Sequence, residues 1–174
     1  QYVPDQNDIY MYVAVASAQT KSYDEALEML STGLTYVDEN DAVTKSFFYG
    51  QMGDVYHSSG NREKAYEMYD KALSYNASNL AVLNNYSYFL AIEGRDLNRA
   101  ERMSAQTVKA EPDNATYLDT YAWIFFKQGN YSLARLYMKN ALDKTEEPSA
   151  ELFEHYGDIL FMLGEVDEAV EYWQ

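Results

Sequence analysis

Apolar residues recur along the chain at the three- and four-residue spacing that places them on one face of a helix. They come in paired stretches separated by a short polar break, which often contains glycine. After residue 82, one such face carries Leu83, Tyr86, Ser87 and Leu90. Gly94 follows, at the place where many helices end in a left-handed residue. The pattern therefore predicts antiparallel helix pairs joined by tight turns.

The helix pair repeats five times. Each first stretch contains a small residue, at Ala14, Gly53, Ser87, Ala122 and Gly157, and each second stretch opens with an alanine, at Ala26, Ala65, Ala100, Ala134 and Ala169. Successive alanines are 39, 35, 34 and 35 residues apart, which is the period of a helix-turn-helix repeat. We predict an all-α solenoid of ten helices without a sheet, with repeats at about 7–40, 46–79, 80–113, 115–148 and 150–174.

The small residues predict close helix crossings, at which an aromatic side chain of the neighbouring helix fills the space. Gly53 and Gly157 are the strongest examples. The first repeat departs from the pattern, because Lys21 stands where a glycine is expected. Five extra residues at 41–45 predict a longer first helix in the second repeat, and one extra residue near Arg95 predicts a longer turn in the third.

Composition narrows the partners. Acidic residues outnumber basic ones 28 to 13, for a net charge of -15, so nucleic acid and anionic membranes are excluded as expected partners. Cysteine is absent, which excludes disulfides and thiolate metal sites.

Apolar runs such as residues 122–126 are far shorter than the roughly 20 residues of a membrane span. We expect one continuous array, with an incomplete last repeat, cut at both ends from a longer protein.

Several short segments resemble the sequence motif of the tetratricopeptide repeat (TPR). They are residues 60–65, 129–134 and 163–169, together with 71–73 and 140–142. The resemblance covers the chain from about residue 7 onward. Residues 84–90 and 117–123 also resemble repeats of TPR proteins exported to the bacterial cell envelope, which are often lipid-anchored. The resemblance to the TPR family implies a right-handed superhelix. In such a superhelix, the first helices of the repeats line a concave groove that holds an extended peptide or a helix of a partner protein. The narrower resemblance favours the periplasmic side of a bacterial envelope over the cytoplasm.

The TPR register assigns groove-facing positions to each first helix. The predicted partner-binding residues are Tyr12, Gln51, Asp54, His57, Asn84, Asn85, Tyr88, Asp119, Trp123, Lys127, His155 and Asp158. Tyr88 and Trp123 are the expected anchors, lying side by side on the groove wall, because other apolar residues already fill the interhelix positions. The alternative for every position in this set is ordinary core packing or solvated surface.

The charge of these positions indicates the chemistry of the partner. The TPR proteins that capture a carboxylate tail carry lysine, arginine and asparagine on three successive repeats, and that set is missing here. Asp54, Asp119, Glu154 and Asp158 instead predict a basic or neutral-apolar protein segment.

Catalysis is not expected. His57 has Asp54 one turn away, and His155 has Glu151 and Asp158, so each histidine with its acids is a candidate metal site, or a base with its orienting acid. Each pair offers few ligands, and phosphate loops and nucleophile motifs are absent. We predict a binding scaffold without cofactor or metal. The alternatives are a self-associating structural module, giving a homo-oligomer, and a regulatory arm of an enzyme or envelope machine encoded elsewhere on the full chain.

Overall fold

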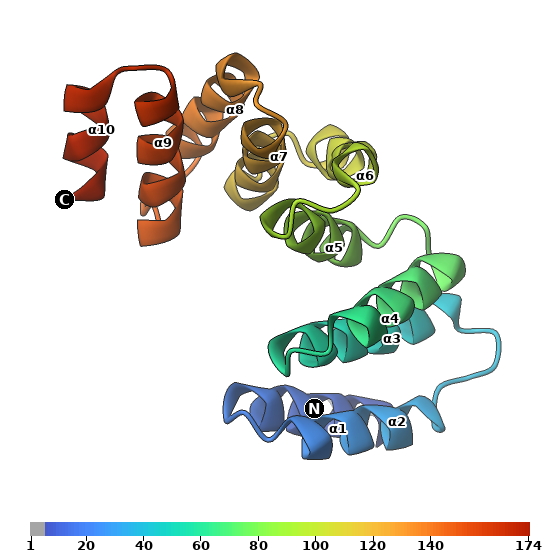
Figure 1. The fold of residues 1–174 in the computed structure, drawn as a ribbon. Coiled ribbons are helices and arrows are strands. Elements are labelled where there is room, and N and C mark those ends of the chain that lie inside the picture. The colour runs from blue at the N-terminus through green and yellow to red at the C-terminus, as the bar shows by residue number, and fades with distance from the viewer. Residues whose placement is uncertain (1–5) are drawn as a thin grey trace. The chain divides into compact units, whose positions relative to one another are not determined.

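The computed structural model describes residues 6–174, which form ten α-helices and no strand (Figure 1). The helices are α1 (Gln6–Gln19), α2 (Tyr23–Leu34), α3 (Ala42–Ser58), α4 (Arg62–Tyr75), α5 (Leu80–Ile92), α6 (Leu97–Ala110), α7 (Ala115–Lys127), α8 (Tyr131–Asp143), α9 (Ala150–Met162) and α10 (Val166–Trp173). This confirms the predicted helix pairs. The chain divides within α5 into a first unit ending at Val82 and a second unit beginning at Leu83.

Polar caps and left-handed turns explain where the helices begin and end. Asn61 and Asn130 precede α4 and α8, and the side chain of each accepts a hydrogen bond from a backbone N–H in the first turn of its helix. Gly94 follows α5 with φ +66°, as the sequence predicted. Lys21 adopts the same conformation after α1, with φ +62°, although it carries a side chain. The turn of the first repeat therefore keeps its shape without glycine.

The two predicted irregularities are present. Helix α3 has 17 residues, against 14 in α1, and it begins directly after Asp41, whose carboxylate accepts a hydrogen bond from the Thr44 N–H. The turn between α5 and α6 contains one residue more than the other turns within repeats. Its last residue, Asp96, has φ +37° and caps α6. Both insertions thus lie at helix ends, where they leave the packed faces in register.

In the first unit, α1 packs on α2 and α3 packs on α4. Phe48 of α3 is buried and reaches back to Gly33 of α2, where an added Cβ would lie 2.7 Å from its ring. An added Cβ at Gly53 would lie 2.4 Å from the ring of Tyr69, which is fully buried in α4. The predicted close crossing at Gly53 is confirmed, because no side chain fits between the helices there.

In the second unit, the cores of the fourth and fifth repeats are continuous and include Leu118, Met138, Tyr156 and Ile159. An added Cβ at Gly157 would lie 2.4 Å from the indole nitrogen of Trp173, so the predicted close crossing of α9 with α10 is also confirmed. Within this unit, α7 lies on the inner side of the curve and α8 on the outer side (Figure 1). The exposed face of α7 therefore lies on the concave side of this unit.

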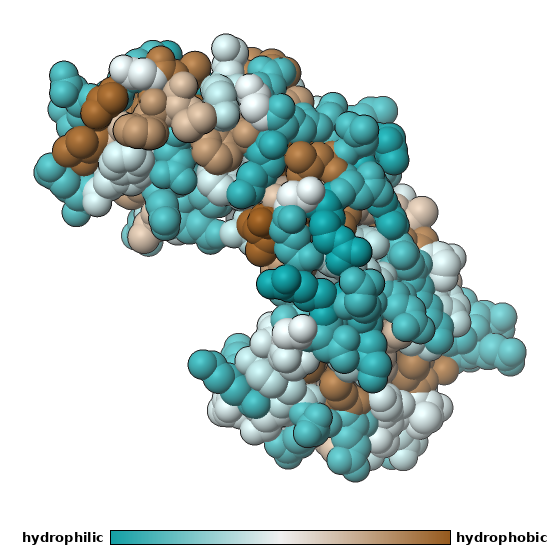
Figure 2. Space-filling view, viewed as in Figure 1, coloured by the Kyte–Doolittle hydropathy of each residue, from teal (hydrophilic) through white to brown (hydrophobic). Residues whose placement is uncertain are grey.

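Hydrophilic residues cover most of the surface in view, with scattered apolar patches (Figure 2). Among residues 6–174, no helix has the length and apolar character needed to cross a membrane.

Candidate protein-binding face

Two polar contacts tie the first turns of α9 to earlier first helices of the second unit. The hydroxyl of Tyr88, on α5, donates a hydrogen bond to the carboxylate of Glu151, on α9. Tyr88 is half-buried, whereas Glu151 is exposed. These helices belong to the third and fifth repeats, so the bond passes over the fourth. Together with α7, they form what we call the acidic face: Tyr88, Asp119, Glu151, Glu154, His155 and Asp158.

The second contact is buried. Nδ1 of His155, on α9, lies 2.8 Å from a carboxylate oxygen of Asp119, on α7. The imidazole stacks on the indole of Trp123, with ring centroids 3.9 Å apart, and Trp123 stacks in turn on Phe126 at 4.5 Å. His155 is only 6% exposed. Hence the carboxylate that contacts this histidine comes from the preceding repeat, and not from Glu151 or Asp158, the acids one turn away on its own helix.

Trp123 is not an exposed anchor. It is 8% exposed, because His155 covers one face of its ring and Phe126 packs against it. Its Nε1–H is buried and has no hydrogen-bond acceptor within the described residues. Lys127 is exposed, and its ammonium group lies 5.2 Å from the centre of the same ring. The expectation of a freely accessible Trp123 beside Tyr88 is therefore corrected.

The two asparagines of α5 also differ from the open groove positions that the register assigned. Asn84 is 7% exposed, and its side-chain oxygen has no hydrogen-bond donor within the described part of the chain. Asn85 is half-buried, and its side-chain oxygen lies 3.5 Å from the amide nitrogen of Asn84. Asn84 thus offers little surface to a partner in this conformation.

The remaining charge on the acidic face is negative. Glu154 is exposed and Asp158 is half-exposed. The pKa of Tyr88 is raised above its ordinary value, first by burial, then by the hydrogen bond to Glu151 and by the negative charges of Glu151, Asp119 and Glu154. The carboxylates of Glu151, Asp119 and Glu154 thus act together on the Tyr88 hydroxyl, and such a gathering of negative charge attracts cations.

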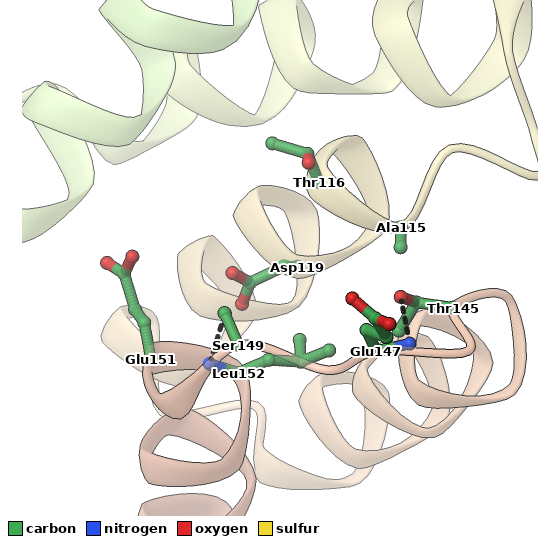
Figure 3. A pocket seen from close by; sticks show the side chains of 8 residues that line it. All are labelled: Ala115, Thr116, Asp119, Thr145, Glu147, Ser149, Glu151 and Leu152. Atoms are coloured by element: carbon green, nitrogen blue, oxygen red, sulfur yellow. Dashed lines mark hydrogen bonds between the residues drawn. The ribbon is translucent and has the colours of Figure 1, made fainter.

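A pocket of about 200 Å³ opens between α7 and the segment that leads into α9 (Figure 3). Its lining residues are Ala115, Thr116, Asp119, Thr145, Glu147, Ser149, Glu151 and Leu152. In Figure 3, Asp119 extends from α7 toward the start of α9, where the Ser149 hydroxyl caps the helix by accepting the Leu152 N–H. A volume of about 200 Å³ fits one side chain rather than a cofactor.

The predicted positions in the first unit form a separate group. Tyr12 is 64% exposed on α1. The carboxylate of Asp54 accepts a hydrogen bond from the buried Tyr69 hydroxyl at 2.6 Å, and the Gln51 amide nitrogen lies 3.3 Å from it. His57 is half-buried one turn further along α3. Asp54 thus stabilises the α3–α4 pair, besides any contact it makes with a partner.

Glu151 and Phe126 belong to the contacts of this face but were absent from the predicted set of site residues. The register assigned Trp123 and Lys127 to the groove and did not include Phe126, although its ring extends the stack on Trp123. Glu151 precedes His155 by one helical turn, so the sequence did show that it shares a face with the histidine. Nothing in the sequence indicated that it reaches Tyr88. Among residues 6–174, no three His, Asp or Glu side chains are placed to hold a metal ion.

Comparison with known proteins agrees with the repeat structure. Two family models, both described as Tetratricopeptide repeat, match residues 48–79 and 120–174. A TPR repeat-containing protein of Methanocaldococcus jannaschii is 31% identical over 69% of this chain and 21% of its own length. A TPR repeat-containing protein of Pseudomonas aeruginosa is 24% identical over 86% of the chain and 24% of its own length. The chain thus spans about a fifth to a quarter of these relatives.

Two solved structures resemble the fold over nearly the whole chain. The segment of MamA from residue 41 to its end, from Desulfovibrio magneticus RS-1, has a TM-score of 0.77 and 18% identity, covering 99% of this chain and 93% of that segment. PilF of Pseudomonas aeruginosa has a TM-score of 0.80 and 20% identity, covering 96% of this chain and 73% of PilF. Such identities bear on the fold alone. The repeat period, the ten helices and the family matches together identify the chain as a tetratricopeptide-repeat protein, and hence as a scaffold for protein–protein interaction.

Proposed function

We propose that the acidic face of the second unit binds a basic or neutral-apolar segment of a partner protein, without chemistry of its own. The observation that carries the proposal is the gathering of Asp119, Glu151 and Glu154 around Tyr88 on the first helices. A positively charged segment would be steered toward this face and would find carboxylate oxygens to accept its hydrogen bonds.

Only part of the face is free to make such contacts. Asp119 is already engaged by His155, and Glu151 by Tyr88. Glu154 and Asp158 have no cationic partner within the described residues, and they lie one turn apart on α9. These two carboxylates are therefore the first contacts that we assign to a basic side chain of the partner.

A peptide selection tests the proposal. The chain is immobilised and used to select binders from a displayed library of random linear peptides, which are then measured one by one by calorimetry. We expect selected peptides to be rich in lysine, arginine and apolar residues. The double variant Glu154→Lys/Asp158→Lys reverses two charges on the acidic face, so it should weaken binding by at least about tenfold, since rim and hot-spot charge contacts together are worth roughly 1–2 kcal/mol.

The matched control reverses two exposed carboxylates on the second helices, in Asp143→Lys/Glu171→Lys. Both doubles change the net charge equally, so a general electrostatic effect would appear in both. Equal loss in the control, or selected peptides that are acidic, would contradict the proposal. Circular dichroism of each variant checks that the helical content is unchanged.

For localisation, we propose the periplasmic side of a bacterial envelope. The support is the resemblance of residues 84–90 and 117–123 to exported TPR proteins. The full-length reading frame tests it: a signal peptide or lipobox is expected, and a frame with neither would place the protein in the cytoplasm.

A further inference from the structure

The hydrogen bond between Tyr88 and Glu151 has an unusual place in a repeat protein. In a solenoid each repeat packs on its immediate neighbours. Here a side chain of the third repeat bonds to one of the fifth, 63 residues further along the chain. Such a contact forms only when the second unit is curved enough to bring α5 and α9 together, so it reports and stabilises one curvature.

The bond ends on α9, the helix that also carries His155, whose imidazole covers one face of the Trp123 ring. Trp123 and His155 are both less than 10% exposed, and they lie on α7 and α9, the helix that the bond passes over and the helix at which it ends. The closed arrangement is imperfect, because the Nε1–H of Trp123 is buried without an acceptor within the described residues. A buried unpaired donor opposes the closed state, since water or a carbonyl would satisfy it once the face opened.

We propose that the Tyr88–Glu151 hydrogen bond is a latch that holds the acidic face in a closed form, and that the face opens to expose Trp123 when the bond breaks. One bond between a half-buried hydroxyl and an exposed carboxylate holds the latch, and the unpaired Nε1–H of Trp123 opposes it. The contacts of His155 with Asp119 and Trp123 also hold α9 on α7, so loss of the Tyr88–Glu151 bond shifts the population toward the open form without abolishing the closed one. The inference rests on the proposed function, because opening gives a bound segment access to Trp123.

Tryptophan quenching tests the latch without any partner. The chain contains two tryptophans, so Trp173→Phe is placed in every protein compared, which leaves Trp123 as the reporter. Tyr88→Phe removes the hydroxyl and keeps the ring, and Glu151→Ala removes the acceptor. Each substitution should raise the equilibrium constant for opening, the ratio of open to closed form, by about fivefold, which corresponds to the usual net contribution of one hydrogen bond. Acrylamide should then quench Trp123 more strongly.

Three further variants separate a latch from a general loss of packing. Glu151→Gln keeps an oxygen that can accept the hydrogen bond from the Tyr88 hydroxyl. Acrylamide should therefore quench Trp123 in this variant nearly as much as in the parent. In the double variant Tyr88→Phe/Glu151→Ala, acrylamide should quench Trp123 no more than in either single variant, because the two substitutions remove the same hydrogen bond. Tyr117→Phe is the matched control, since the Tyr117 hydroxyl has no hydrogen bond within the described residues.

The outcomes distinguish the latch from the function on which it rests. Unchanged quenching in Tyr88→Phe and Glu151→Ala, or additive effects in the double variant, would overturn the latch even if the selected peptides bind. Peptides that bind Tyr88→Phe about fivefold more tightly than the parent would support it. Increased quenching without any selected peptide would leave the latch standing and refute the proposed function. Glu151 is exposed, so Glu151→Ala remains informative if Tyr88→Phe folds poorly.

Discussion

At single positions, the distance between paired helices depends on which residue faces an aromatic ring. Gly53 faces Tyr69, and Gly157 faces Trp173, with no space for a side chain in either case. Tyr69 is fully buried, and its hydroxyl is held by Asp54, so the ring has no room to move away. Because the interior is closely packed, a larger side chain at either glycine would have to displace the helix backbone.

We expect Gly53→Leu to lower the free energy of unfolding by about 1–3 kcal/mol, because the new side chain must push α3 away from α4. The measurement is chemical denaturation followed by circular dichroism. Ala16→Leu, at an exposed position of α1, is the control and should change stability little. A Gly53→Leu protein as stable as the parent would show that the crossing is looser than the structure describes.

At the scale of helices, the turns within the repeats share one left-handed position, but its residue varies. Gly60, Gly129 and Gly164 have φ between +78° and +85°, where glycine is unstrained. Lys21 has φ +62° at the same position of the first repeat. A side chain in this region costs roughly 1–2 kcal/mol, so at this position the first turn carries strain that glycine avoids in the other repeats.

The variant Lys21→Gly should therefore raise the melting temperature, although the gain is reduced by the greater entropy of glycine in the unfolded chain, about 0.4–1 kcal/mol. Gly129→Ala makes the reverse change in the fourth repeat and should lower it. Differential scanning calorimetry measures both. Destabilisation by Lys21→Gly would mean that the lysine side chain contributes contacts that outweigh the strain.

At the scale of the whole molecule, charge is the dominant feature. A net charge of -15 on 174 residues makes the folded chain repel itself. Salt screens repulsion between exposed charges beyond about 8–10 Å. The same repulsion disfavours acidic partners and the association of the chain with itself through its acidic face.

We expect the melting temperature to rise when sodium chloride is increased from low to physiological ionic strength, because screening relieves repulsion more in the compact state than in the unfolded chain. The Asp143→Lys/Glu171→Lys variant, which is less negative by four charges, should show a smaller rise. A melting temperature that falls with salt would mean that favourable ion pairs outweigh the net repulsion.

The amino-acid sequence by itself determined the repeats, because hydrophobic spacing, small residues and turn signals recur with one period. It also located the longer α3, the extra turn residue and the close crossings at Gly53 and Gly157. It did not determine which groove positions are covered. Trp123 and His155 lie 32 residues apart, and their stacking depends on how α9 packs beside α7. The bond from Tyr88 to Glu151 depends on the curvature summed over two repeats, which only the tertiary structure decides.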